Sequence, residues 1–261
     1  MSNIPTVYIG YDSKEHEAYE ILKESILDTT SDPVNVVALD QGTLRRINFF
    51  RRSFKLEDGV TVDTQDKKPF SSEFSFTRFL VPFVNNLKGL ALFMDCDMLV
   101  RSDIMEVFKY ASREDKAIWC VKHDYNPSSK TKMDNQVQTQ YNRKNWSSFV
   151  LWNCEHEAHE NLTVDDVNLK TGYYLHNFKW LSDDLIGDLP EEWNWLDGHS
   201  PEKIKAKNIH FTTGGPWFGN WKPKRLIDAK YALEWKNFRD SINLDNIMGK
   251  DKTIKWNKTY E

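Results

Sequence analysis

The sequence lacks several features that would assign it to other classes of protein. No apolar run approaches the roughly 18 residues that a membrane span requires. The opening segment, MSNIPTVYIGYD, has neither the basic region nor the apolar stretch of a signal peptide. Basic side chains (35) do not outnumber acidic ones (39), so no positive surplus points to nucleic acid or to an anionic membrane surface. We therefore expect a cytoplasmic protein with no integral membrane segment and no nucleic-acid partner.

Cysteine is also scarce, whereas aromatic residues are plentiful. Cys96, Cys120 and Cys154 are widely spaced and form no CxxC motif, which is typical of reduced, mostly buried thiols. Aromatic residues make up 13% of the chain and include 10 tryptophans, a generous number for a chain of this size, and sugar-binding sites use flat aromatic rings as platforms. The tryptophans that we consider as platforms for an acceptor, each with the core as its alternative location, are Trp193, Trp195, Trp217 and Trp221.

Alternating strand and helix patterns predict an α/β fold. TVYIG (6–10) and VNVVAL (34–39) read as strands, and between them apolar residues recur at helical spacing. This βαβ unit implies a parallel sheet. The further elements that we expect are strands at 90–94, 117–121, 148–153 and 208–212, a helix at 74–87 interrupted at Pro82, and a helix at 225–242.

The length of 261 residues suits one large domain with an extension. We expect residues 1–222 to form that domain and residues 223–261 to form a C-terminal helical extension with a polar tail. Residues 125–145 are polar and too long for an ordinary connection, so they predict a functional loop that closes over a ligand. The side chains expected to serve that loop are Lys132, Gln136, Gln140, Tyr141, Arg143 and Lys144.

Two aspartates interrupt the apolar stretch LALFMDCDMLV (90–100). Asp95 and Asp97 follow a strand that reads as buried on both faces, and ligands of open α/β sheets bind beyond the carboxyl ends of the strands. Two carboxylates so close together repel each other unless a cation lies between them, and oxygen ligands suit Mn²⁺ or Mg²⁺. The alternative is a capped turn with solvated acids. Cys96 is poorly matched to such an ion, and we expect its side chain to point into the core.

The order of motifs along the chain resembles that of GT-A-fold nucleotide-sugar glycosyltransferases. The series runs YIGYD, FTRFLVP, LALFMDCDMLVRSDI, SSFVLWN, WLSDDLIG and HFTTGGPWF. It is most similar to the retaining, family 8-type group. The resemblance implies a Rossmann-like GT-A fold, with a central, mostly parallel sheet flanked by helices.

The same resemblance implies a metal site and an arginine beside it. Asp95 and Asp97 would be joined by His210, whose alternative is an ordinary strand-end histidine, and a histidine ligand favours Mn²⁺ over Mg²⁺. Arg78, in TRF, would reach the diphosphate or a metal-ligating aspartate, because a guanidinium binds oxygens bidentately and stays charged. A surface helix arginine is its alternative.

The donor site implied by the resemblance draws on three segments. Tyr11 would stack on the base and Asp12 would bind base or ribose, although Asp12 is also well placed to cap a helix. The glycines before Pro216 would let the backbone approach the diphosphate. The donor-site residues that we expect are Ile9, Gly10, Tyr11, Asp12, Arg78, Asp95, Cys96, Asp97, Gly214, Gly215 and Trp217. The group usually carries a lysine just before Pro-Trp, which is missing here, so Lys222 or Lys224 would replace it.

Asp183 and Asp184, in WLSDDLIG, match the part of the family that lies beneath the reacting sugar. Together with Arg78 they are the catalytic residues that the resemblance implies. One of them would act as nucleophile if retention proceeds by double displacement. In the alternative, the leaving phosphate itself deprotonates the acceptor. The group has Asp-Gln-Asp where this chain has Ser182-Asp183-Asp184, so the match is approximate.

These observations predict a hexosyltransferase. It would move a hexose from a nucleoside diphosphate sugar, UDP-linked, to a saccharide or glycan acceptor with retention, using Mn²⁺ or Mg²⁺, in polysaccharide biosynthesis. An inverting GT-A enzyme using a GDP- or UDP-sugar is one alternative. The others are a sugar-phosphate nucleotidyltransferase, although YIGYDSKE is not a Gly-rich phosphate loop, and a non-catalytic glycan-binding protein.

Overall fold

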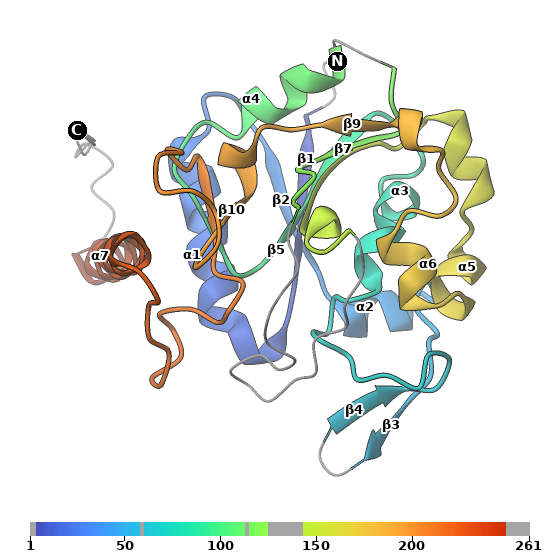
Figure 1. The fold of residues 1–261 in the computed structure, drawn as a ribbon, viewed down its shortest axis with the longest axis horizontal. Helices are drawn as coiled ribbons and strands as arrows, with labels where there is room; N and C mark the ends of the chain where they lie inside the picture. Colours follow the sequence, from blue (N-terminus) through green and yellow to red (C-terminus); the bar gives the residue numbers. More distant parts are fainter. Residues whose placement is uncertain (1–3, 58–59, 113–114, 125–142, 249–261) are drawn as a thin grey trace.

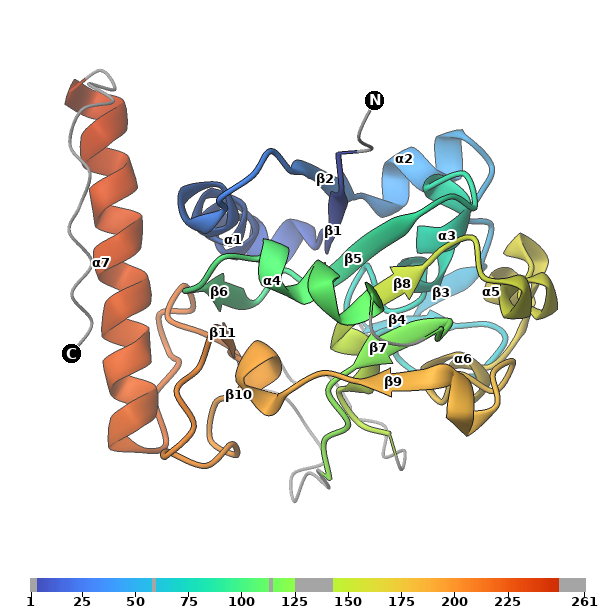
Figure 2. The same ribbon diagram turned by 90° about the horizontal axis from the view of Figure 1, so that it is seen from above.

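The computed structural model describes residues 4–57, 60–112, 115–124 and 143–248. Figures 1 and 2 show a central sheet with helices on both sides of it and a long helix, α7, along one side of the molecule. The strands are β1 Thr6–Gly10, β2 Asn35–Leu39, β3 Phe54–Glu57, β4 Val60–Asp63, β5 Leu90–Asp95, β6 Met98–Val100, β7 Ile118–Cys120, β8 Phe149–Asn153, β9 Ile186–Asp188, β10 Trp195–Leu196 and β11 Asn208–His210. The α-helices are α1 His16–Thr29, α2 Gln41–Arg46, α3 Val81–Val84, α4 Met105–Phe108, α5 Val164–Leu169, α6 Gly172–His176 and α7 Leu226–Met248.

The central sheet has the strand order β2-β1-β5-β8-β7-β9 among the described residues. Strand β1 pairs in parallel with β2 and β5, and β7 pairs in parallel with β9, whereas β8 runs antiparallel to both of its neighbours. The prediction of an α/β fold with a mostly parallel central sheet flanked by helices is confirmed. The central position of β5 explains its sequence, since Ala91 to Met94 are fully buried and both faces of the strand are covered.

The first βαβ unit forms as its pattern predicts. Asp12 caps a 3₁₀ turn, Ser13–Glu15, by accepting a hydrogen bond from the Lys14 N–H. Helix α1 then buries the face that carries Ala18, Leu22 and Ile26, which recur at the spacing of one helix stripe. These side chains cover the sheet, and the chain returns as β2 beside β1.

A second, three-stranded sheet lies beside the central one, in the order β10-β11-β6. Strand β6 follows β5 after two residues, so the chain passes directly from one sheet into the other. The second sheet and α7 share a separate hydrophobic cluster that includes Trp195, Phe211, Tyr231 and Trp235. Helix α7 therefore packs against the side of the second sheet (Figure 2).

The C-terminal helix that the sequence predicts at 225–242 is present and continues to Met248. The division into residues 1–222 and 223–261 stays a prediction, and the polar tail after residue 248 lies outside the described residues. Within the part of the chain that is described, no helix is long and apolar enough to cross a membrane.

Two local expectations need correction. The helix expected at 74–87 is only a 3₁₀ turn, Thr77–Leu80, followed by the short α3. Pro82 lies at the start of α3, where its missing N–H costs nothing, so the proline begins a helix instead of interrupting one. The hairpin of β3 and β4, which projects from the body of the molecule in Figure 1, was not predicted.

Candidate active site

The two aspartates of MDCDM lie where the chain crosses from the central sheet to the second sheet. Asp95 is the last residue of β5, opposite Gly10 of β1, and Asp97 immediately precedes β6. Cys96 between them is fully buried in the main hydrophobic cluster, and burial raises the pKa of its thiol well above the ordinary value. The expected core position of the Cys96 side chain is confirmed, so this residue offers a donor substrate no exposed side-chain atom.

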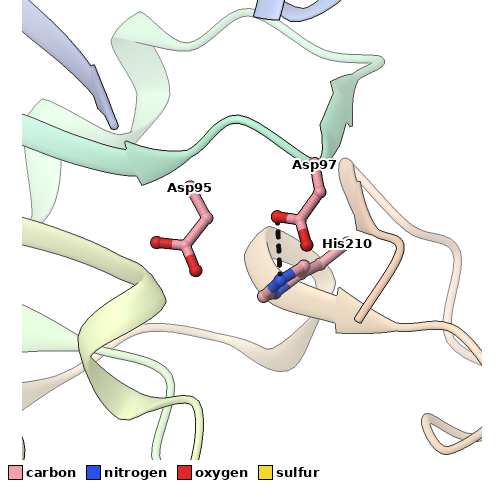
Figure 3. A group of neighbouring side chains, drawn as sticks. All are labelled: Asp95, Asp97 and His210. Carbon is pink, nitrogen blue, oxygen red and sulfur yellow. Dashed lines mark ion pairs between the residues drawn. The ribbon is translucent and has the colours of Figure 1, made fainter. Parts of the chain in front are cut away.

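His210 joins the aspartates from a distant part of the sequence. It ends β11, opposite Met98 of β6, so the pairing of these two strands carries its imidazole toward Asp97. One ligand atom from each of Asp95, Asp97 and His210 lies within 4.8 Å of the other two, and none of the three residues is more than 9% exposed. Figure 3 shows the Asp97 carboxylate facing the imidazole and the Asp95 carboxylate close by.

The hydrogen bonds around His210 show that the cluster of Asp95, Asp97 and His210 suits a cation. The Nδ2 of Asn194 donates to Ser148 Oγ (3.0 Å), so its Oδ1 is the atom that faces His210 Nδ1 at 2.9 Å. The proton of a neutral imidazole is then on Nδ1, and Nε2 carries a lone pair. That Nε2 lies 3.2 Å from Asp97 Oδ1. Two lone pairs at this distance repel each other unless a positive charge lies between them, and two carboxylates with one imidazole are suitable ligands for Mn²⁺.

Arg78 holds Asp95 from the opposite side. Its guanidinium nitrogen lies 2.9 Å from Asp95 Oδ1 and donates to the Ser147 carbonyl at 2.9 Å. The side chain is 6% exposed and lies between the rings of Phe74 and Phe93. The surface alternative for Arg78 is therefore wrong, and the predicted contact with an aspartate of the cluster is present. A buried cation at this distance favours the ionised form of Asp95.

The segment after β1 lies beside the cluster, because Gly10 is paired with Asp95. Ile9 is fully buried and contributes no side chain to the edge of the sheet. A Cβ on Gly10 would meet the Phe74 ring at 2.6 Å, so close packing requires the glycine. Tyr11 is half-buried and its hydroxyl contacts His16 Nδ1 at 3.2 Å.

Asp12 accepts a backbone hydrogen bond with each of its two carboxylate oxygens. The carboxylate accepts from Lys14 N–H and from Glu73 N–H, each at 3.0 Å. The helix-capping alternative is thus confirmed for this residue. Its contact with a base or ribose stays a prediction.

The two positions before Pro216 require glycine for different structural reasons. Gly214 adopts φ +92°, a backbone conformation that favours glycine. At Gly215, a Cβ would meet the Trp217 ring at 2.0 Å. Gly215 therefore makes room for the indole, which packs against Phe211 and Trp235. That its backbone approaches a diphosphate stays a prediction.

Asp183 and Asp184 lie in a 3₁₀ turn, Asp183–Leu185, just before β9. They precede β9, which runs parallel to β7, and β7 and β5 both run antiparallel to β8. The end of β9, at Asp188, therefore shares the edge of the sheet with Asp95, while its start lies toward the opposite edge. Asp183 is 82% exposed and paired with Arg143, and the Asp184 carbonyl accepts from Lys116 at the start of β7. No described contact joins either carboxylate to Asp95, Asp97 or His210, and the catalytic role of Asp183 and Asp184 stays a prediction.

The predicted tryptophan platforms are also mostly absent. Trp193 and Trp195 are fully buried and Trp221 is 9% exposed, so the core alternative is correct for these three, while Trp217 is partly buried. Residues 125–142 of the predicted loop, with Lys132, Gln136, Gln140 and Tyr141, lie outside the described residues.

Sequence reasoning missed Asn194, Ser147 and His123. Asn194 is fully buried in the motif WNW and orients His210. Ser147 fixes Arg78 through its carbonyl. His123 follows the end of β7, the position after a strand where ligands of α/β sheets bind. That positional rule was the available signal for His123, whereas Asn194 and Ser147 became recognisable only through their tertiary contacts.

Comparison with known proteins identifies one curated relative and a recurrent fold. Protein CDI of Arabidopsis thaliana is 41% identical over 247 residues, which cover 92% of this chain and 88% of that protein. No family model matches the sequence. Similar solved structures include the galactosyltransferase LgtC in complex with donor and acceptor sugar analogues, with TM-score 0.55, 10% identity, and 90% of this chain and 95% of that chain covered.

Two further glycosyltransferases have the same fold. The glycosyltransferase GlyE of Streptococcus pneumoniae has TM-score 0.55 and 14% identity, with 94% of this chain covered. The bifunctional glycosyltransferase WbbM has TM-score 0.54 and 14% identity, with 83% of this chain covered. This chain spans 64% of the GlyE chain and 47% of the WbbM chain. The central α/β architecture is therefore the GT-A fold of these glycosyltransferases.

Proposed function

Because this chain belongs to the family of Protein CDI from Arabidopsis thaliana and has a glycosyltransferase fold, we propose that it is a metal-dependent glycosyltransferase. Its donor is a nucleoside diphosphate sugar, UDP-linked, and its acceptor is a saccharide or glycan. It transfers a hexose with retention of the anomeric configuration and contributes to polysaccharide biosynthesis.

The observation that carries the proposal is the cluster of Asp95, Asp97 and His210. It lies at the carboxyl end of β5, beside the end of β1, where α/β folds bind their ligands. The Asn194 contact gives His210 the tautomer that a metal ligand needs. These three side chains would hold Mn²⁺, with Mg²⁺ as the alternative. A bound divalent cation would supply Lewis-acid stabilisation of the departing diphosphate.

The charges of the site support this assignment. Two carboxylates and the Arg78 guanidinium leave a net charge of about −1 at the cluster, which repels a diphosphate. A divalent ion would reverse that sign. Arg78 is held by Ser147 and by aromatic rings, so it keeps Asp95 in place without having to move. Lys222 and Lys224 are exposed and are the first two lysines after the position of the missing lysine.

The position of Asp183 and Asp184 bears on the route of retention. Because both lie exposed near the start of β9, no described contact supports either as the nucleophile of a double displacement. We favour a reaction on one face of the sugar. The bond between the anomeric carbon and the phosphate oxygen breaks, the acceptor oxygen bonds to that carbon from the same side, and its proton passes to the released phosphate. An inverting enzyme would instead need a base that takes the proton of the acceptor hydroxyl as it attacks from the opposite face of the sugar.

Two other classes of function fit the observations less well. A sugar-phosphate nucleotidyltransferase needs a phosphate loop after the first strand, but the segment after β1 forms a 3₁₀ turn capped by Asp12. A non-catalytic glycan-binding protein would present aromatic rings, whereas Trp193, Trp195 and Trp221 are in the core. Such a protein would also have no use for a buried Asp-Asp-His group.

A donor screen with purified protein tests the proposal. Release of nucleoside diphosphate is followed with UDP- and GDP-sugars, with Mn²⁺, with Mg²⁺ and with EDTA. We expect hydrolysis or transfer only with a divalent ion, and NMR of the product should show retention. Asp97→Asn should abolish metal-dependent donor binding. The matched control is Asp63→Asn, which removes a buried carboxylate that pairs with Arg52 at 2.6 Å and should lower stability without affecting donor binding. Activity in EDTA equal to that in Mn²⁺ would contradict the proposal.

A further inference from the structure

A polar pocket of about 570 Å³ is formed by the segments that follow β7 and β9 and by residues of β10 and the turn after it. Its lining includes Lys122, His123, Asp124, Asp188, Glu191 and His199. The volume is typical of a small-molecule site, which ranges from roughly 300 to 1,000 Å³. Sequence analysis assigned no function to any of these side chains.

The pocket is adjacent to the metal-binding group through two connections. Leu196, which lines the pocket, is the direct strand partner of His210. His123, which also lines it, makes a hydrogen bond with the backbone of Asn194, the residue whose side chain orients His210. A ligand in the pocket would therefore lie next to a donor bound at the metal.

His123 offers this pocket a hydrogen-bond acceptor. The residue is 8% exposed, and its Nε2 has no hydrogen-bond partner among the described residues. Burial lowers the pKa of His123 to about 3, so the imidazole is neutral at physiological pH. With its other nitrogen engaged by the Asn194 backbone, Nε2 carries a lone pair. A buried acceptor without a partner is costly, and a hydroxyl group of a ligand would satisfy it.

The charges of the pocket select against anions. Lys122 is paired with Asp188 at 3.1 Å, which leaves the carboxylates of Asp124 and Glu191 without a balancing cation among the described residues of the lining. Burial lowers the pKa of His199 to about 4, so this imidazole is also uncharged. The described lining residues therefore have a net charge of about −2, which repels phosphates and carboxylates and leaves hydroxyl groups as the matching ligand chemistry.

We infer that this pocket binds the acceptor as a neutral, hydroxyl-rich saccharide, with His123 Nε2 accepting a hydrogen bond from one of its hydroxyls. The inference depends on the proposed function, because it names the acceptor of that transferase. It divides the site into two parts: the diphosphate binds at the Asp-Asp-His group, and the uncharged sugar binds beside His123.

The test uses the full chain with Mn²⁺ and its nucleotide sugar. The acceptor probes are methyl glycosides of neutral hexoses and the matching methyl glycosides of uronic acids. Transfer is measured as nucleoside diphosphate release above the rate with water, and binding of the glycosides is measured by saturation-transfer NMR. Metal-dependent binding of the nucleoside diphosphate is measured first, because its absence in the wild type would overturn the proposed function itself.

Two substitutions at His123 distinguish the loss of its hydrogen bond from a change in the size of the side chain. His123→Phe should raise the KM for the neutral glycoside about tenfold, the effect of one lost hydrogen bond, with the Kd of the nucleoside diphosphate unchanged. His123→Gln keeps an acceptor atom and should retain most of the wild-type affinity. If His123→Phe transfers with the wild-type KM, or if the wild type hydrolyses its donor but no neutral glycoside binds, the inference is wrong and the proposed function stands.

A third variant tests the charge argument and keeps the test valid if His123→Phe fails to fold. The Asp188 side chain is 75% exposed, so Asp188→Asn should not disturb the core. It should increase the affinity for the uronic acid glycoside relative to that for the neutral glycoside about fivefold, as expected for removing one charge near the protein surface. A wild-type preference for uronic acids over neutral glycosides, or an unchanged ratio in Asp188→Asn, would overturn the inference.

Discussion

Asn194 is the residue on which the metal site should depend most without providing a ligand. Its amide oxygen lies 2.9 Å from His210 Nδ1, and its amide nitrogen donates to Ser148 Oγ and to the Asn145 carbonyl. In Asn194→Ala, the Nδ1 proton of His210 loses its acceptor. The imidazole can then take the other tautomer, with its proton on Nε2 toward Asp97. In that form Nε2 has no lone pair and cannot bind a metal beside Asp97.

The expected loss can be given a magnitude. Removing the partner of a metal-ligating histidine typically weakens metal binding by about 10- to 100-fold, which corresponds to about 1.4–2.7 kcal/mol. The variant also leaves buried polar groups unsatisfied, so the free energy of unfolding of the metal-free protein should fall by about 1–3 kcal/mol. These two effects require separate measurements.

Calorimetric titration of Mn²⁺ into metal-free protein measures the first effect, and urea unfolding in EDTA measures the second. Asn208→Ala is the matched control, because Asn208 lies on the same strand as His210, is equally buried, and donates to the Trp193 carbonyl and to Met98 Sδ. It should lose stability and keep its Mn²⁺ affinity. A wild-type Kd in Asn194→Ala, or an equal loss of affinity in Asn208→Ala, would refute the reasoning.

Three further perturbations have defined outcomes. Arg78→Met leaves the carboxylate at the end of β5 buried without its cation, so the free energy of unfolding in EDTA should fall by about 3–5 kcal/mol. Mn²⁺ should then raise the melting temperature of the variant more than that of the wild type. Equal shifts of the melting temperature would contradict this. Gly215→Ala should lower the melting temperature and change tryptophan fluorescence, since its Cβ would meet an indole ring, whereas Gly219→Ala meets nothing within 4 Å and serves as the control. The pH dependence of folding depends on four histidines and one aspartate whose pKa values are shifted in the folded protein. Burial lowers the pKa of His123 to about 3, the pKa values of His159 and His199 to about 4, and the pKa of His176 well below its ordinary value, so unfolding takes up protons on these side chains below pH 6.5. Burial raises the pKa of Asp197 to about 6, which opposes this uptake in the same range. The net uptake of between two and three protons should make the free energy of unfolding in EDTA rise by about 3–4 kcal/mol per pH unit from about pH 4.5 to 6. Urea titrations that show a flat or falling dependence would contradict the assignment.

Local pattern was sufficient for the elements that are buried on one or both faces. The run LALFM predicts β5 because a strand covered on both sides needs continuous apolar residues, and α1 follows from its apolar stripe. The same reasoning failed for residues 74–87. Apolar residues there surround Arg78, and whether such a segment forms one helix or two short turns depends on contacts with β5 and β8 that are absent from local sequence.

The candidate site divides in the same way. Asp95 and Asp97 are recognisable because ionised side chains directly after a buried strand need an explanation, and the resemblance between motifs pointed to Arg78 and His210. Asp183 and Asp184 were named from the same resemblance, and their catalytic role stays a prediction. The parallel course of β9 places Asp188 at the edge of the sheet that carries Asp95, and Asp183 is paired with Arg143.

The sequence by itself determined the kind of fold and the chemistry of the proposed metal ligands, because periodicity and buried charge are properties of neighbouring residues. The tertiary structure alone decided which distant groups orient those ligands. Asn194 faces His210 because β10 and β11 pair, and His123 borders the pocket beside them because β7 ends at the same edge of the central sheet as β5. Strand register is set by the packing of the whole domain, so no short segment of the sequence contains this information.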